Sequence, residues 1–293
     1  MDLRAKSCFA LSRLLLKPPS ERTIDYSVYS NWRSDHLAKS WSAFSDLSIT
    51  HRDVLDFGCG DGPLSIFLAE SKRPKRLVGV DLRADAIERA RENLQSVSLA
   101  PGVQVEFLVG ETNAIPAPDR SFDTLLAFDC LEHVMSPESI LREWHRVLRP
   151  GGRCLIEWFP YKGPWGPHME SLIPIPWAHV IFGERAMMRA AEKIYDLPEF
   201  THRHWDLDAD GRKKPNKWRA WSTFAEQGYI NKLDLKTFRE LVKIAGFQIA
   251  RLDLHSFSGS RIRRLTGHSL MRLPVVGEYF LSYVTVELVR TPD

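Results

Sequence analysis

Short apolar runs alternate with segments of helical spacing from about residue 53 to residue 158 of this 293-residue chain. The strand candidates are 53–57, 76–80, 103–109, 123–129 and 152–159, and the helical candidates between them are 63–71, 84–97 and 136–149. This alternation is typical of βαβ units, whose parallel strands are buried on both faces by helices. The same pattern resumes with a helix over 233–247 and strands over 247–257 and 283–290. It predicts an α/β fold with a mostly parallel sheet.

The stretch 160–232 interrupts this rhythm with proline-rich and aromatic sequence around one helical piece at 183–196. Six of the nine tryptophans lie between 158 and 221: Trp158, Trp165, Trp177, Trp205, Trp218 and Trp221. Linkers are not this aromatic, so we interpret the stretch as an insertion that forms a lid over an apolar compound. The N-terminal DYSVYSNWR, at 25–33, is a candidate second wall. Ordinary core packing is the alternative for most of these aromatic residues.

Composition narrows the class of partner. The net charge is +3, and the basic residues cluster only at 212–214 and 261–264, which we interpret as solvated loops rather than a nucleic-acid surface. No apolar run approaches 18 residues, which argues against a membrane span. The basic N-terminal segment, 1–20, predicts a surface helix, with an organellar transit peptide as the alternative. The four cysteines form no CxxC pair, so we expect core thiols in a reducing, cytoplasmic compartment.

A glycine loop follows the first predicted strand, in VLDFGCGDGPLS from Val54 to Ser65. A dinucleotide fingerprint GxGxxG counted from Gly58 requires glycine at position 63, where this chain has Pro63. A phosphate-binding P-loop is excluded because no GKS or GKT follows. Gly58, Gly60 and Gly62 still leave the backbone open to a ligand, although such glycines also occur for turn geometry alone.

Acidic residues follow the predicted strands at the edge where α/β sheets bind ligands. Asp56 disfavours a pyrophosphate and favours a cationic group. Asp81 ends the second strand, where a carboxylate accepts the hydroxyl protons of a ribose, with a helix-capping role as the alternative. Glu111 follows the third strand and suits the exocyclic amine of a base. These three positions and the loop point to S-adenosylmethionine.

Four motifs in the expected order resemble the class I S-adenosylmethionine-dependent methyltransferases, in the small-molecule branch like methyltransferase type 11. They are VLDFGCGDG, VGVDLRADAIERARENL, ETNAIPAPDRSFD and LEHVMSPESILREWHRVLRPGGRCLIE. The resemblance covers about 53–158 and the elements after 232. It implies a Rossmann-like three-layer sandwich with a seven-stranded sheet whose last strand is antiparallel. We expect an N-terminal helical lid segment at 1–50, a cofactor-binding core at 51–159, the insertion at 160–232 and completion of the core at 233–293.

The resemblance also implies residue roles. Asp56, Gly58, Gly60 and Gly62 would hold the methionine part, Asp81 the ribose, Leu82 the adenine face, Glu111 and Thr112 the adenine edge, and Asp129 and Cys130 the region near the amino group. This chain departs from the family pattern twice. Glu111 replaces the usual Asp, and Ala117 replaces a usual Phe.

Histidines are the candidate catalytic groups, because imidazole removes protons near neutral pH. His133 follows the fourth strand, and His168 comes from the insertion together with His179. The alternatives are packing beside the cofactor for His133 and a loop hydrogen bond for His168. The run HRHWDLDAD at 202–210 has metal-ligand residue types, but its spacing suits neither zinc nor a calcium loop, so we predict a solvated loop and no metal.

These observations favour a methyltransferase that acts on a small, fairly hydrophobic metabolite in small-molecule biosynthesis or secondary metabolism. Oxygen is the favoured acceptor, with carbon and nitrogen open. The alternatives are an RNA or protein methyltransferase, a non-catalytic S-adenosylmethionine-binding partner subunit, and a nicotinamide-dependent oxidoreductase. Pro63 and Asp56 argue against the last of these. A homodimer is left open.

Overall fold

The computed structural model describes residues 1–257, 267 and 269–292, and the chain divides into two compact units. Unit 1 contains residues 1–32, 160–232 and 256–282, and unit 2 contains residues 33–159, 233–255 and 283–293. The basic cluster at 261–264 lies outside the described residues.

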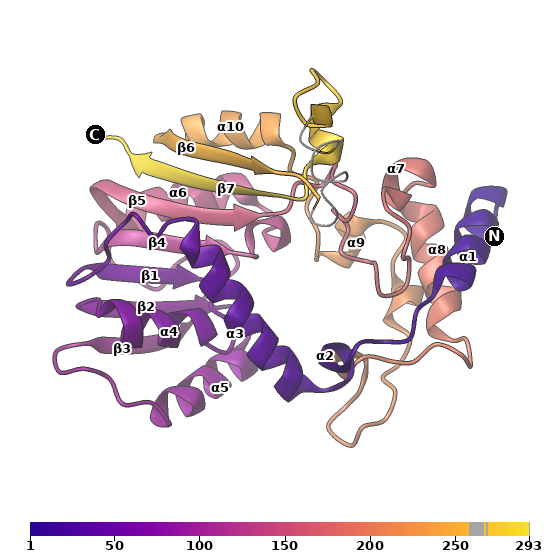
Figure 1. The fold of residues 1–293 in the computed structure, drawn as a ribbon, viewed down its shortest axis with the longest axis horizontal. Helices are drawn as coiled ribbons and strands as arrows, with labels where there is room; N and C mark the ends of the chain where they lie inside the picture. Colours follow the sequence, from indigo (N-terminus) through magenta and orange to yellow (C-terminus); the bar gives the residue numbers. More distant parts are fainter. Residues whose placement is uncertain (258–266, 268, 293) are drawn as a thin grey trace. The chain divides into compact units, whose positions relative to one another are not determined.

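Unit 2 is built on one seven-stranded sheet with the order β3-β2-β1-β4-β5-β7-β6 (Figure 1). Its strands are β1 (Asp53–Phe57), β2 (Arg76–Asp81), β3 (Gln104–Val109), β4 (Phe122–Phe128), β5 (Leu148–Trp158), β6 (Phe247–His255) and β7 (Tyr283–Arg290). Strand β7 is antiparallel to its neighbours β5 and β6, while β1 to β5 pair in parallel. The predicted seven-stranded sheet with an antiparallel last strand is confirmed.

Helices cover both faces of this sheet, as the alternating pattern predicts. They are α3 (Tyr26–Ser42), which unit 2 shares from Arg33 onward, α4 (Pro63–Lys72), α5 (Ala84–Gln95), α6 (Pro137–Val147) and α10 (Leu235–Ile244). Leu37 of α3 and Leu68 of α4 join one core cluster with Leu126 of the sheet. The rings of Trp144 and Phe238, from α6 and α10, pack against Phe57 and Trp158 on the opposite face. Successive residues along each strand point alternately into these two cores. The three-layer arrangement of helices, sheet and helices therefore follows from strands that are apolar on both faces.

The junction of α6 and β5 differs in detail from the sequence prediction. The helix ends at Val147 and the strand begins at Leu148, whereas the pattern predicts a strand from residue 152. Leu148 pairs with Phe122 of β4 and Arg153 pairs with Thr124, so the RPGG run between them forms a bulge within the strand instead of a separate loop. Ser136 precedes Pro137 at the start of α6 as predicted, but its side chain makes no capping hydrogen bond.

Unit 1 contains most of the aromatic insertion and is mainly irregular (Figure 1). Its helices are α1 (Leu3–Leu15), α2 (Glu21–Ile24), α7 (Ala178–Ile181), α8 (Glu184–Tyr195) and α9 (Phe224–Gln227), with short 3₁₀ turns η2 (His204–Asp206), η3 (Lys217–Ala220) and η4 (Gly277–Phe280). Helix α1 packs on α8, and both contribute to an apolar core with Trp218 and Phe224. The predicted N-terminal surface helix is present as α1. Within the described residues, no helix is both long and apolar enough to span a bilayer.

The cysteines behave as the sequence predicts. Cys8, Cys59, Cys130 and Cys154 are all buried and free. Burial raises the pKa of each thiol, which keeps the four groups neutral and unreactive at physiological pH.

Candidate functional site

The candidate site of unit 2 lies where the order of the sheet changes direction. The chain runs from β1 outward to β2 and β3, and then returns to place β4 on the other side of β1. Ligands of open α/β sheets bind at the carboxyl ends of the strands at such a switch point. The glycine loop follows β1, Asp81 ends β2, and Asp129 follows β4, so the topology brings these sequence-predicted residues to one edge.

The three loop glycines all have left-handed backbone angles, with φ of +78° at Gly58, +55° at Gly60 and +83° at Gly62. A Cβ added to Gly58 would lie 2.7 Å from Cβ of Cys130, and one added to Gly62 would lie 2.7 Å from Cζ of Phe107. A Cβ on Gly60 would meet no heavy atom within 4 Å. Packing therefore requires glycine at the two outer positions, while the middle position leaves open backbone for a ligand.

Asp81 is held by two backbone donors. Its Oδ2 accepts a hydrogen bond from Gly60 N at 2.9 Å, and its Oδ1 accepts one from Arg83 N at 2.9 Å. Arg83 is the N-cap residue of α5, so the carboxylate links the loop to the strand end rather than capping the helix. Each carboxylate oxygen has a further lone pair for a hydroxyl donor. The next residue, Leu82, leaves 57% of its surface exposed and so offers an apolar contact beside this carboxylate.

Two buried carboxylates flank β4 on the face covered by α3 and α4. Ser65 Oγ donates to Asp56 Oδ2 at 2.6 Å, and Ser40 Oγ donates to Glu157 Oε1 at 2.7 Å. Burial is the main cause that raises the pKa of Asp56 to about 6 and the pKa of Glu157 to about 7. Each strand end thus holds an acid that a nearby cation would help to ionise.

Asp129 adopts the left-handed conformation at φ +56°, which is unusual for a residue other than glycine and is often retained at functional sites. Arg33 of α3 forms an ion pair with its Oδ2. His36 Nε2 lies 3.7 Å from the same oxygen and 3.9 Å from Glu157 Oε1. Arg33, His36 and Glu157 are not among the site residues that the sequence motifs predict. Two features of the sequence could have indicated them. Arg33 and His36 are three residues apart and so share one face of a helix, and Glu157 is an acid inside an apolar strand.

Carboxyl groups are the most numerous polar side chains at this edge of the sheet. Five carboxyl groups lie near the strand ends: Asp56, Asp81, Asp129, Glu132 and Glu157. Burial, reinforced by the charge of Asp129, raises the pKa of Glu132 well above its ordinary value. Arg33 pairs with Asp129, and its charge also acts to lower the pKa of Asp56, Glu132 and Glu157. The edge therefore favours a ligand that brings further positive charge.

The side chains of His36, Asp129 and Glu157 offer ligand atoms within 4.8 Å of one another. Such a set could bind a metal ion, but Arg33 already supplies a fixed positive charge to Asp129. A guanidinium at this position competes with a divalent cation for the same oxygen. The absence of a metal from the reaction therefore stays a prediction.

Glu111 and Thr112 are exposed just beyond the carboxyl end of β3. Gly110 N donates to the Asp81 carbonyl at 2.9 Å, which fixes this segment beside the end of β2. The loop that continues from it is held by Arg146 of α6, which donates to the carbonyls of Ala117 and Ile115. Where the family pattern has a phenylalanine at position 117, this chain therefore holds the loop through backbone contacts to an arginine.

The two candidate catalytic histidines belong to different units. His133 ends the 3₁₀ turn η1 (Leu131–His133) of unit 2, and its backbone N donates to the Cys130 carbonyl at 2.9 Å. His168 belongs to unit 1, has φ +51°, and its N donates to the Trp165 carbonyl at 2.8 Å. Both remain candidates.

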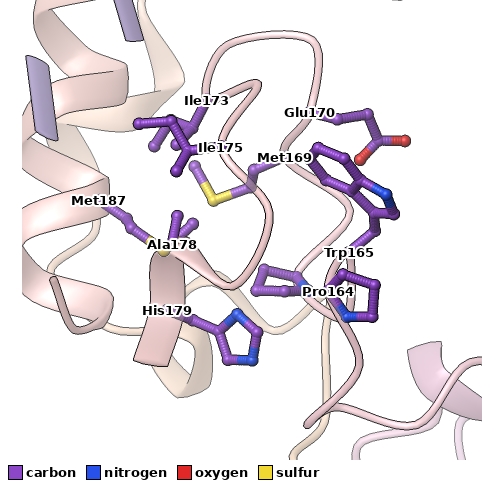
Figure 2. Close-up of a pocket in the computed structure, with 10 residues that line it drawn as sticks. Pro164, Trp165, Met169, Glu170, Ile173, Ile175, Ala178, His179 and Met187 are labelled. Atoms are coloured by element: carbon purple, nitrogen blue, oxygen red, sulfur yellow. The ribbon is translucent and has the colours of Figure 1, made fainter. Parts of the chain in front are cut away.

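Unit 1 has a small apolar pocket inside the insertion (Figure 2). Its lining includes Met169, Ile175, Ala178, Met187 and His179. His179 is 8% exposed, and the centroids of its ring and of the Tyr161 ring lie 4.9 Å apart. Burial lowers the pKa of His179 to about 4, and the Tyr161 carbonyl opposes this only in part. The imidazole is therefore neutral at pH 7 and can donate or accept one hydrogen bond inside an apolar lining.

The run at 202–210 is a set of turns rather than a uniformly solvated loop. Asp208 Oδ1 accepts hydrogen bonds from the backbone N of Asp210 and Arg212, which is ordinary turn chemistry. Asp206 corrects the expectation of full solvation, because it is buried and its Oδ2 accepts a hydrogen bond from Arg203 N.

A family model described as a methyltransferase domain matches residues 55–156, which span the glycine loop and β1 to β5. A ubiquinone biosynthesis O-methyltransferase of Stutzerimonas stutzeri is 30% identical over 196 residues, which cover 66% of this chain and 67% of that relative. The chain belongs to the class I S-adenosylmethionine-dependent methyltransferases, and S-adenosylmethionine is the cofactor of this family.

Other relatives differ in their acceptor atom. A norajmaline N-methyltransferase of Rauvolfia serpentina is 30% identical over 142 residues, covering 48% of this chain and 47% of its own. A ubiquinone/menaquinone biosynthesis C-methyltransferase of Enterobacter sp. is 31% identical over 135 residues, covering 45% and 53%. The chain thus spans about half the length of several curated relatives that it matches.

Solved structures agree on the fold. A chain in the complex between the Haloferax volcanii Trm112 methyltransferase activator and a methyltransferase has a TM-score of 0.54 and 17% identity, over 92% of this chain and 95% of that chain. The [4+2]-cyclase SpnF has a TM-score of 0.51 and 15% identity, over 95% and 86%. At this identity, the likeness establishes the fold alone.

The residues of this chain fit the cofactor of the family. The open backbone at Gly60 admits a ligand, the oriented Asp81 carboxylate can accept ribose hydroxyls, and exposed Leu82 suits a flat base. The excess of carboxylates suits the sulfonium and ammonium charges, and Arg33 suits the single carboxylate of the amino-acid part.

Proposed function

We propose that this protein transfers the methyl group of S-adenosylmethionine to a small, largely apolar metabolite, with oxygen as the favoured acceptor atom. The observation that carries this proposal is the arrangement at the end of β2, where Asp81 is oriented by Gly60 N and stands in an edge rich in carboxylates. This arrangement suits a nucleoside with a positive charge and without phosphate. A buried carboxylate such as Asp56 would instead repel a pyrophosphate.

The proposed roles follow from position. In this proposal Gly58, Gly60 and Gly62 leave room for the methionine part of the cofactor, and Asp56 faces its positive charge. Asp81 binds the ribose, and Leu82 packs on the adenine, whose edge contacts Glu111 and Thr112. Asp129 and Cys130 close the region near the amino group. Arg33 adds a contact that the family motifs do not specify. Because it already pairs with Asp129, it would orient that acid as well as attract a carboxylate.

When bound, S-adenosylmethionine supplies a methyl group on a positively charged sulfur, which is open to in-line attack. The contribution of the chain is to position the two reactants and to keep water away from them. An oxygen acceptor must also lose its proton, and His133 and His168 are the candidate bases for that step. His133 follows Cys130 closely, so it stands on the segment proposed to border the amino-acid part of the cofactor.

The small-molecule proposal is supported by unit 1. Its small pocket places Met169, Ile175 and Met187 beside the neutral imidazole of His179 and the carboxyl group of Glu170, so unit 1 offers both apolar and polar side chains to an acceptor. We propose that segments 1–50 and 160–232 act as a lid for such an acceptor over the core at 51–159 and 233–293. The low net charge and its scattered basic residues weigh against RNA as acceptor. The buried free thiols support a reducing compartment, and we propose the cytoplasm.

The test is a transfer assay with S-adenosylmethionine labelled in its methyl group. The panel contains phenols, quinols, fatty acids and small amines, with tRNA and histone protein as the macromolecular arm. With the wild-type chain we expect the methyl label to appear in an apolar compound that carries a hydroxyl group. With the Asp81→Ala variant we expect no label in that compound. Label only in tRNA or protein would contradict the small-molecule proposal. Tight cofactor binding without transfer to any compound would instead support a non-catalytic partner subunit.

A further inference from the structure

Helix α1 exposes leucine side chains that its own packing does not use. Leu3 is 80% exposed and Leu14 is 82% exposed, while Leu11 and Leu15 are each 42% exposed. The opposite side of the helix is already occupied, because Ala5, Cys8 and Ser12 are buried and Phe9 and Leu16 pack on the core of unit 1. The outward leucines are therefore a second apolar face, not the core face of an amphipathic helix.

These leucines form a continuous surface on the helix. Leu3, Ala10 and Leu14 are spaced by seven and four residues, which places them on one face of a helix with 3.6 residues per turn. Leu11 and Leu15 lie on the next row of the same side. Isolated exposed leucines are common on proteins, but a row of them on one short helix is not. We call Leu3, Ala10, Leu11, Leu14 and Leu15 the outer face of α1.

Basic residues lie along one border of the outer face and within it. Segment 3–17 has four basic residues and no acidic residue, namely Arg4, Lys6, Arg13 and Lys17. By the helical period, Lys6 and Arg13 lie beside Leu3, Ala10 and Leu14, and Arg4 lies between Leu11 and Leu15; Lys17 follows the end of the helix. All four are exposed, and Arg13 forms an ion pair with Glu199 at 2.6 Å.

We propose that the outer face of α1 binds the surface of an anionic phospholipid membrane, with the helix lying in the plane of the interface. Exposed leucines next to lysine and arginine, with no acidic residue among them, are the combination by which interfacial helices insert apolar side chains and contact anionic headgroups. Charge argues against a second copy of the chain as the occupant. Two α1 helices packed through this face would bring basic borders together with no acidic partner in segment 3–17.

The experiment is flotation of the purified full-length chain with vesicles of neutral phosphatidylcholine or with vesicles containing roughly one third phosphatidylglycerol. We expect binding to the anionic vesicles at low salt, weaker binding at high salt, and little binding to the neutral ones. Leu3→Glu with Leu14→Glu should lower the bound fraction at least about fivefold, because both insertion and charge attraction are lost. Both side chains are at least 80% exposed, so the fold should be kept, and a thermal melt verifies it.

A matched control carries the same change of charge at other exposed apolar positions. Ile244→Glu with Val275→Glu, at residues that are 56% and 93% exposed, should leave flotation unchanged. Lys6→Gln with Lys17→Gln should weaken binding to the anionic vesicles alone. The proposal is overturned if the wild-type chain stays unbound, or if the leucine variant floats like the control. It is also overturned if light scattering shows a dimer that the leucine variant dissociates while vesicles bind neither protein.

Discussion

The backbone N of Gly60 donates a hydrogen bond of 2.9 Å to Oδ2 of Asp81, and this contact joins the loop after β1 to the end of β2. Arg83 N holds the other oxygen, so the carboxylate is oriented before any ligand arrives. Orientation in advance lowers the conformational cost of binding. Gly60 and Asp81, on which the cofactor proposal rests, are therefore linked directly, and a substitution at either residue tests the same binding site.

Replacement of Asp81 by alanine should weaken the binding of S-adenosylhomocysteine by about 10- to 100-fold, because hydrogen bonds to a charged group are lost. Calorimetric titration measures the change. Asp85→Asn is the control, since Asp85 is exposed in the first turn of α5 and pairs with Arg83 and Arg89. Equal affinity in Asp81→Ala and Asp85→Asn would remove the ribose role from Asp81.

Two glycine substitutions separate backbone strain from ligand access. Gly60 and Gly102 have φ of +55° and +85°, and an added Cβ meets no heavy atom within 4 Å at either one. Alanine at each position should therefore cost about 1–2 kcal/mol of stability through backbone strain alone. Only Gly60→Ala should also weaken the binding of S-adenosylhomocysteine. Thermal melts and titrations of both variants check this, and parallel loss of affinity in Gly102→Ala would speak against it.

Stability should depend on pH through Asp56. Burial raises its pKa in the folded state to about 6, above its ordinary value of 3.8, so the folded state binds this proton more tightly than the unfolded state does. The stabilising contribution is therefore complete below pH 3.8 and is lost as the pH rises through 6, up to about 3 kcal/mol in all. Denaturant unfolding between pH 4 and 8 should show a smaller fall in Asp56→Asn than in the wild type, because buried Glu132 and Glu157, whose pKa values are also raised, act in both proteins. A constant difference between the two across that range would contradict the assignment.

Cofactor binding should follow pH in the opposite direction. Ionised Asp56 attracts a positive ligand group, so the affinity for S-adenosylhomocysteine should rise as the pH increases from about 5 to 7.5. Asp56→Asn should flatten this rise, while Glu157→Gln should remove the part that extends toward pH 7, since the pKa of Glu157 is about 7. Titrations at four pH values would measure it. A rise of equal size in Asp56→Asn would assign the effect to another group.

Histidine base catalysis predicts a loss of turnover without a loss of cofactor affinity. If His133 or His168 removes the acceptor proton, its replacement by alanine should lower kcat by about 10²- to 10⁴-fold and should remove the acidic limb of the pH–rate profile. His51, which is exposed in a turn of unit 2, is the control position. Unchanged turnover in both His133→Ala and His168→Ala would exclude base catalysis by these residues.

The sequence predicts the sheet well because each strand is short, apolar and bounded by a turn. The predicted first strand over 53–57 and last strand over 283–290 have the same bounds in the structure. The start of β5 is displaced because Leu148 pairs with Phe122 across a register shift in the neighbouring strand. Pairing between distant segments decides such details, and a local pattern of proline and glycine does not contain it.

The site is predictable only where its residues belong to motifs. Gly60 and Asp81 lie in runs whose order along the chain already indicates a nucleoside site. Arg33 and His36 come from a helix before the first strand, and they join Asp129 only through tertiary packing. The charge of Arg33 matters because it opposes the effect of burial, which raises the pKa of Asp56 and of Glu157. The buried, neutral state of His179 is likewise a consequence of packing that no spacing rule predicts.

The central claim is that the carboxyl edge of β1, β2 and β4 binds a phosphate-free, S-adenosyl nucleoside. Calorimetric titration of the wild-type chain with S-adenosylhomocysteine and, in parallel, with NADH tests it most directly. We predict saturable binding of S-adenosylhomocysteine with one site per chain and no measurable heat from NADH. Saturable binding of NADH together with no binding of S-adenosylhomocysteine would contradict the claim.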